Sequence, residues 1–209
     1  MLRSSGVGKT QSARHYSQWD MIEAHDLLDR EATVPPPALQ NCRTVLYTPG
    51  VANTPRSIAR EVHVQRVQLA HVVRQSQQIA EGKDPYRIDW GDTDRHTELI
   101  IVDEADRLKV QGLEQMRDIY DRGRMGLILI GMPGIEKRLA RYPQLYSRVG
   151  FVHQFSPPSP AEMRFILEHQ WGQLGLTLNP NDLTRMPKPC PQSFASQAGT
   201  SDWYNGYSR

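Results

Sequence analysis

The sequence predicts an α/β protein in which helices cover both faces of a parallel sheet. Short, nearly continuous apolar runs at 43–48, 99–102 and 127–130 alternate with longer amphipathic segments. The hydrophobic share of 38% leaves enough apolar side chains for a buried core, although the mean hydropathy of −0.58 is slightly polar. A length of 209 residues predicts one full domain, or one domain and part of a second.

Each element follows from its apolar spacing and its flanking residues. The β-prone run at 43–48 ends at Pro49-Gly50, which predicts a strand closed by a turn. Thr54-Pro55 is typical of a helix start, and one apolar face continues from there to about Ala80. The runs at 99–102 and 127–130 predict the next two strands. The remaining expected elements are a polar loop at 81–97, helices at 108–122, 135–141 and 160–174, and a last strand at 149–155.

Composition excludes several classes of protein. The 25 basic and 23 acidic residues give a net charge of +2, which is unlike a strongly basic nucleic-acid binder. Cys42 and Cys190 are far apart and lack metal-site spacing, so we expect plain thiols. There is neither a run of about 18 apolar residues nor an apolar signal-peptide core. We therefore expect a cytoplasmic chain without a membrane partner.

The first chemical motif is the end of a phosphate-binding loop of the pattern G-x-x-x-x-G-K-[ST], formed by Gly6, Val7, Gly8, Lys9 and Thr10. Glycines let the backbone N–H groups turn toward phosphate, the lysine reaches the β- and γ-phosphates, and the threonine hydroxyl is a ligand for Mg²⁺. Arg3 occupies the place of the first glycine. The alternative is a Gly-rich loop that matches by chance.

The second motif is the apolar strand 99–102 followed by Asp103 and Glu104, the Walker B pattern. We expect Asp103 to hold Mg²⁺ and Glu104 to polarise the water that attacks the γ-phosphate. The alternative is that these acids only cap the next helix, to whose solvated start we assign Asp106 and Arg107. Together the two motifs predict a P-loop nucleotide-binding fold that takes ATP and Mg²⁺.

A third stretch begins at Gly131-Met132-Pro133-Gly134 and ends at Ser147-Arg148-Val149-Gly150. With this stretch the chain resembles the AAA+ ATPases, and among them the TniB-like and MuB-like transposition accessory proteins. The resemblance covers about 3–183. It implies that Arg148, or less so Arg141, is a finger that reaches the nucleotide of a neighbouring subunit in a homo-oligomeric ring or filament. The resemblance also implies two partners, which are DNA and a transposase. Where the family has a polar sensor residue, this chain has Gly131 and Met132. Neither residue can donate a side-chain hydrogen bond that would orient water.

The resemblance further implies DNA contacts by basic residues on the long helix and the loop after it. The alternative is a solvated helix face. The candidates are Arg60, Arg66, Arg74, Lys83, Arg87 and Arg95.

The predicted organisation is a nucleotide-binding domain at 1–156, the start of a helical lid at 157–183 and a disordered tail at 184–209. The strand before the phosphate loop is absent from the sequence, and the tail lacks any periodicity, so we expect a truncated start and a frameshift after about Thr184. Two alternatives follow: an inactive remnant of such an ATPase, or a P-loop ATPase that serves another DNA-associated process.

Overall fold

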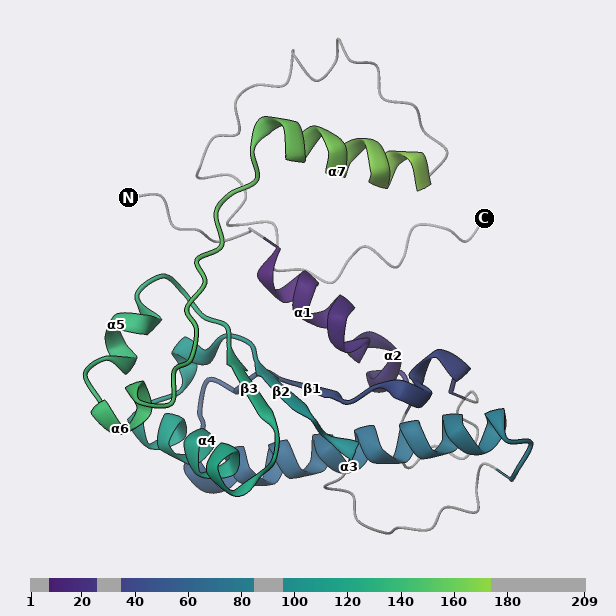
Figure 1. The fold of residues 1–209 in the computed structure, drawn as a ribbon, viewed down its shortest axis with the longest axis horizontal. Helices are drawn as coiled ribbons and strands as arrows, with labels where there is room; N and C mark the ends of the chain where they lie inside the picture. The colour runs from purple at the N-terminus through teal and green to yellow at the C-terminus, as the bar shows by residue number, and fades with distance from the viewer. Residues whose placement is uncertain (1–7, 26–34, 85–95, 174–209) are drawn as a thin grey trace. The chain divides into compact units, whose positions relative to one another are not determined.

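The computed structural model describes residues 8–25, 35–84 and 96–173 (Figure 1). The chain divides into two compact units: one runs from Ser4 to Phe155, and the other comprises Ser156–Arg209 with Met1–Arg3. The tail predicted at 184–209, with its proposed frameshift, lies outside the described residues.

The first unit contains a parallel sheet in the order β1-β2-β3, as the sequence predicts. Its strands are β1 (Thr44–Tyr47), β2 (Leu99–Val102) and β3 (Gly126–Leu129). Thr44 is opposite Leu99, and Leu99 is opposite Gly126, so all three strands start at the same level. β1 is buried along its whole length, whereas exposed and half-buried residues alternate in β3. β3 is therefore the exposed edge of the described sheet.

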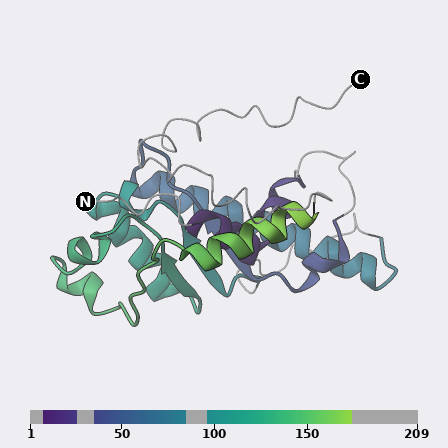
Figure 2. The same cartoon turned by 90° about the horizontal axis from the view of Figure 1, so that it is seen from above.

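Helices pack on both sides of β1, which explains its complete burial. α3 and α4 lie on one side and α1 on the other, and α1 overlies α3 when the molecule is seen from above (Figures 1 and 2). In the described ranges no helix is both long and apolar enough to cross a bilayer. The helical elements of this unit are α1 (Lys9–Ser17), α2 (Trp19–Glu23), η1 (Pro37–Asn41), α3 (Pro55–Ala80), η3 (Ala105–Arg107), α4 (Val110–Arg122), α5 (Ile135–Leu139) and α6 (Pro143–Tyr146). In the second unit the structure describes one helix, α7 (Pro160–Gln173).

α3 organises the unit because its N-terminus is capped and one of its faces is apolar. The Thr54 hydroxyl accepts a hydrogen bond from the Ser57 N–H (3.1 Å), and the Ser57 hydroxyl accepts one from the Thr54 N–H (2.9 Å). This reciprocal capping box satisfies two backbone donors. Beyond it, the apolar face of α3 is buried against the sheet and η1, and its buried members are Ile58, Val62, Leu69, Val72 and Val73.

Polar side chains of α3 also hold neighbouring segments in place. The Ser76 hydroxyl donates to the Pro36 carbonyl (2.9 Å), and the Gln77 amide donates to the Gln40 carbonyl (2.9 Å). These bonds give the Pro36 and Gln40 carbonyls a second donor each, beside the Leu39 N–H and the Arg43 guanidinium. α3 thus positions the chain that leads into β1.

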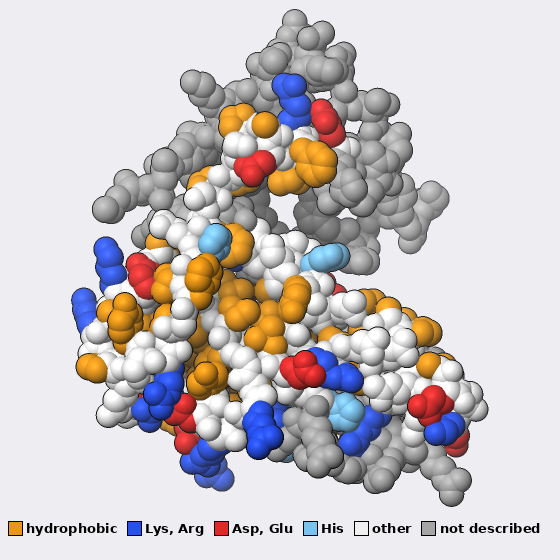
Figure 3. All heavy atoms as spheres, viewed as in Figure 1, with side chains coloured by type: hydrophobic (Ala, Val, Ile, Leu, Met, Phe, Trp, Pro, Cys, Tyr) orange, Lys and Arg blue, Asp and Glu red, His pale blue; other side chains and the backbone are white. Residues whose placement is uncertain are grey.

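The strand predicted at 149–155 is wrong. These residues form no strand, and Phe151 and Val152 are 81% and 57% exposed. A strand needs a neighbour that accepts and donates its ladder hydrogen bonds, and the exposed edge of β3 pairs with β2 alone in the described sheet. Apolar side chains accordingly remain on the surface over β3 and the segment after α6 (Figure 3).

The capping box leads to a test of stability. We expect Thr54→Ala to lower the free energy of unfolding by about 1 kcal/mol, because a hydrogen bond to the first turn of α3 is lost. Urea unfolding followed by circular dichroism would measure this. Thr54→Ser keeps the hydroxyl and serves as the control. Equal destabilisation by both variants would contradict the role of the cap.

Candidate nucleotide-binding site

The end of the phosphate loop leads directly into α1. Gly8 is the N-cap of this helix and has φ 82°, a left-handed conformation that a residue with a Cβ rarely adopts. Lys9 and Thr10 form its first turn, where N–H groups point away from the helix toward an incoming anion. Gly6 and Val7 lie outside the described residues.

The structure brings the two sequence motifs into contact. The Thr10 hydroxyl donates to Oδ2 of Asp103 over 2.7 Å, although the residues are 93 positions apart. Asp103 is only 4% exposed, and its Oδ1 accepts a hydrogen bond from the Glu104 N–H (2.9 Å). A hydroxyl beside a carboxylate is an all-oxygen donor set of the kind Mg²⁺ prefers, so these two side chains fit the metal.

Asp103 is held in place by the sheet. Its N–H donates to the Tyr47 carbonyl (2.9 Å), which continues the pairing of β2 with β1. Tyr47 is itself buried, and its hydroxyl donates to the Glu61 carboxylate of α3 (2.9 Å). Burial and this carboxylate raise the pKa of the Tyr47 phenol well above its usual value, so the hydroxyl stays a donor. The carboxylate of Asp103 is therefore fixed at the carboxyl end of β2.

Glu104 adopts a conformation that turns the chain sharply after β2. Its φ is 49°, in the left-handed region. Its carboxylate forms an ion pair with Arg107, whose guanidinium also donates to the Pro49 carbonyl (3.2 Å) after β1. The carboxylate assigned to water activation is thus held by a cation in this structure.

The loop after β2 also reaches the end of β3. Asp106 accepts a hydrogen bond from the Met132 N–H (3.2 Å), and Arg138 of α5 donates to the Asp106 carbonyl (2.9 Å). A Cβ at Gly131 would lie 2.8 Å from Cδ1 at the end of the Ile135 side chain and 3.2 Å from Oδ1 of Asp106, so a larger residue requires these side chains to shift. The position expected to hold a polar sensor is therefore tightly packed.

Asp106 and Arg107 are the site residues whose contacts the sequence analysis missed. We placed them at a solvated helix start, whereas the structure connects them to the ends of β3 and β1. Their charge, three and four residues after the Walker B aspartate, was the available signal. It was not sufficient, because any helix start can carry such charges.

Arg148 does not lead into a strand, because the strand expected at 149–155 is not formed. It lies in the turn after α6 and is 51% exposed, and its guanidinium donates to Asp121 of α4 (3.0 Å). This hydrogen bond raises the pKa of the Arg148 guanidinium. Arg141 is exposed in the turn between α5 and α6.

The basic residues proposed for DNA binding do not form one uniform stripe. Arg60 is exposed and Arg66 is half-buried on α3. Arg74 donates to His96 (3.1 Å), and Lys83 forms an ion pair with Glu81 (2.6 Å). Arg87 and Arg95 lie outside the described residues.

The parallel sheet, the left-handed Gly8 and the Thr10–Asp103 contact define a P-loop nucleotide-binding domain. A family model described as an AAA domain matches residues 4–139. The chain therefore belongs to the AAA domain family and is an ATP-binding protein of the AAA type. This confirms the predicted fold class.

A curated protein is also similar to this chain in sequence. A protein from Staphylococcus aureus described as a potential ATP-binding protein is 40% identical over 188 residues, which cover 86% of this chain. The chain spans 66% of that protein's length. No solved structure matches the chain.

Proposed function

We propose that the chain binds ATP with Mg²⁺, hydrolyses it, and regulates DNA transposition as a TniB-like or MuB-like protein in the cytoplasm. The observation that supports nucleotide binding best is the hydrogen bond between Thr10 and Asp103, because it joins the phosphate loop to the acidic end of β2. The description of the Staphylococcus aureus relative as a potential ATP-binding protein agrees with this.

In the proposed mechanism each residue has a separate task. The N–H groups at the start of α1 bind phosphate oxygens, and Lys9 neutralises the charge of the β- and γ-phosphates. Thr10 and Asp103 would hold Mg²⁺, and the bound metal would supply charge stabilisation to the phosphates. Glu104 accepts a proton from the attacking water after its carboxylate separates from Arg107.

The proposal also includes a homo-oligomer in which Arg148 acts on the nucleotide of the neighbouring subunit. An exposed arginine held by a single surface carboxylate can leave it at little cost. A guanidinium supplied by another subunit would make hydrolysis depend on assembly.

DNA binding and transposase recruitment complete the proposal. Arginine and lysine side chains are spaced along α3 and α4 (Figure 3). Contacts of this kind bind the phosphate backbone without reading its sequence. The proposed DNA-binding residues are Arg60, Arg66, Arg74, Lys83, Arg87 and Arg95.

Two further candidates remain. Two features favour a chain that binds ATP without hydrolysing it, the inactive remnant: the ion pair between Glu104 and Arg107, and a glycine, Gly131, where a polar sensor residue is expected. The phosphate loop and Walker B residues alone are equally compatible with a P-loop ATPase of another DNA-associated process.

ATP binding is tested at the phosphate loop. We expect Lys9→Ala to lose most affinity for a fluorescent ATP analogue, because the mobile cation on the β- and γ-phosphates is removed. Glu104→Gln is the matched control: it should keep binding and lose turnover, since an amide keeps the shape but cannot act as a base. Unchanged binding by Lys9→Ala would exclude the assignment.

The ion pair at Glu104 makes a separate prediction for turnover. We expect Arg107→Ala to raise kcat about two- to fivefold without changing ATP affinity, because an exposed ion pair is worth about 0.5–1 kcal/mol. Steady-state ATPase kinetics would measure kcat and KM separately. Arg107→Lys retains the charge and should behave like the parent chain. A fall in kcat for Arg107→Ala would mean that the pair holds Glu104 in its productive position.

The role of Arg148 is tested by mixing two inactive variants. Arg148→Ala should keep ATP affinity and lose about 10³-fold in assembly-dependent turnover. Combined Glu104→Gln and Arg148→Ala chains should recover part of the activity, because some interfaces then pair an intact base with an intact arginine. Absence of recovery from chains that co-assemble would assign Arg148 to the structure of its own subunit.

A further inference from the structure

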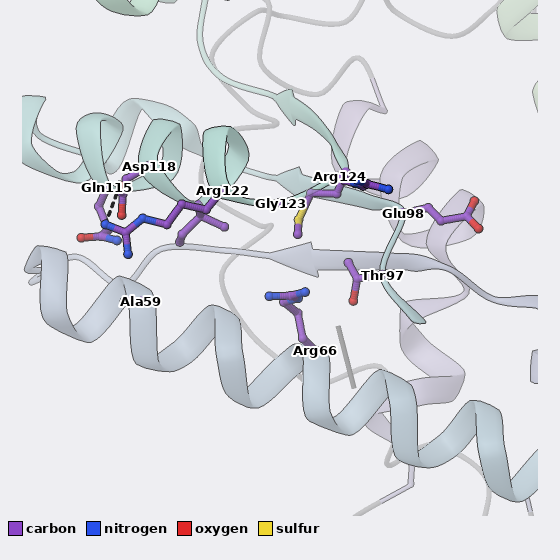
Figure 4. Close-up of a pocket in the computed structure, with 11 residues that line it drawn as sticks. Ala59, Arg66, Thr97, Glu98, Gln115, Asp118, Arg122, Gly123 and Arg124 are labelled. Atoms are coloured by element: carbon purple, nitrogen blue, oxygen red, sulfur yellow. Dashed lines mark ion pairs between the residues drawn. The ribbon is translucent and has the colours of Figure 1, made fainter. Parts of the chain in front are cut away.

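A cavity lies at the opposite end of the sheet from the candidate nucleotide site. It has a volume of about 580 Å³ and is bounded by α3, α4, the residues before β2 and the turn from α4 to β3 (Figure 4). Thr97 lines it and comes two residues before β2, whereas Asp103 directly follows that strand. The cavity is therefore at the amino ends of the strands, away from the phosphate loop.

Thr97 is the first sign that this cavity takes a ligand. The residue is 4% exposed, and its buried hydroxyl has no hydrogen-bond partner within the described ranges 8–25, 35–84 and 96–173. Buried hydroxyl groups nearly always have partners, because the loss of hydration is otherwise uncompensated. Figure 4 shows the Thr97 side chain and the Arg66 guanidinium of α3 pointing into the same space. A ligand there could accept hydrogen bonds from both.

The charges around the cavity favour an anion. Three arginines line it, Arg66, Arg122 and Arg124, against two acidic residues. Each acidic residue has an arginine beside it: Asp118 pairs with Arg122 at 2.9 Å, and Glu98 lies 4.0 Å from Arg43 outside the lining. Arg124 is exposed and has no acidic partner among the residues that the structure describes.

We propose that this cavity is a phosphate-binding site separate from the phosphate loop. The Arg66 guanidinium and the Thr97 hydroxyl donate hydrogen bonds to the phosphate oxygens, and Arg124 contributes further positive charge. Guanidinium groups match phosphate oxygens in geometry and charge, and a hydroxyl adds a directed donor. The phosphate belongs either to a nucleic-acid backbone or to a free phosphate ion. The site requires neither ATP binding nor hydrolysis and shares only Arg66 with the proposed DNA-binding residues.

The experiment uses the Lys9→Ala chain, so that the phosphate loop does not contribute. Inorganic phosphate is titrated at constant ionic strength while thermal unfolding is followed. We expect a saturable rise in Tm, because a ligand that binds only the folded state stabilises it. Adding Arg66→Gln should weaken the apparent phosphate affinity at least tenfold. Arg56→Gln, an exposed arginine of the same helix outside the cavity, is the matched control and should leave it unchanged.

Thr97→Val supplies a second, independent measurement. Without phosphate this substitution should raise Tm. The valine puts a methyl group of similar size in place of a buried hydroxyl that lacks a partner in the described residues. With phosphate it should lose most of the stabilisation. Equal phosphate-induced shifts in the parent, Arg66→Gln and Thr97→Val chains, or no shift in the parent chain, would overturn the proposal.

A competition arm identifies the source of the phosphate. A short labelled DNA duplex is bound to the parent chain and titrated with phosphate. If phosphate displaces the duplex, and if Thr97→Val and Arg66→Gln bind it more weakly, the nucleic-acid backbone is the source of the phosphate. Phosphate-dependent stabilisation without such displacement would identify the free ion. Failure of ATP binding by the wild-type chain would remove the proposed function but leave this result intact.

Discussion

The hydrogen bond between Thr10 and Asp103 is the contact on which the nucleotide site depends. It joins the first turn of α1 to the end of β2, two segments 93 positions apart in the chain. Asp103 can accept this bond because it is nearly buried and because β1 fixes its backbone through the Tyr47 carbonyl. The parallel sheet thus serves the site directly: it places an acidic side chain at the strand ends, where the start of α1 presents N–H groups to an anion.

The same strand ends carry a second set of contacts that bears on the proposed hydrolysis. Arg107 connects Glu104 to the Pro49 carbonyl after β1, and Asp106 connects the loop to Met132 after β3. The loop after β2 is therefore tied to both neighbouring strands. A movement of any of the three strand ends would change the surroundings of the Glu104 carboxylate. This gives a physical route by which the proposed assembly would influence the proposed hydrolysis.

The amino ends of the strands have a different chemistry. There, arginines from α3 and from the α4–β3 turn surround a cavity that contains the buried Thr97 hydroxyl. The two ends of one short sheet thus differ in their polar groups: backbone N–H donors and carboxylate acceptors lie at one end, and guanidinium and hydroxyl donors line the cavity at the other. A chain with a net charge of only +2 can still bind two separate anions when its charges are distributed in this way.

The sequence by itself determined those elements whose signal is local. Apolar runs, the cap at Thr54 and the Walker motifs placed β1, α3, β2, α4 and β3 to within a few residues, because strand and helix periodicities are read from neighbouring positions. The motifs also indicated that Thr10 and Asp103 belong to one site, since P-loop chemistry requires both.

Only the tertiary structure decided what depends on distant partners. The run at 149–155 has the composition of a strand, but strand formation requires a neighbour, and the β3 edge pairs with β2 alone in the described sheet. Three further features likewise depend on which side chains folding brings together. Glu104 pairs with Arg107, Arg148 pairs with Asp121, and the Thr97 hydroxyl meets no partner in the described ranges. Sequence spacing cannot show these contacts, because a polar residue gives no local sign of which group it will meet.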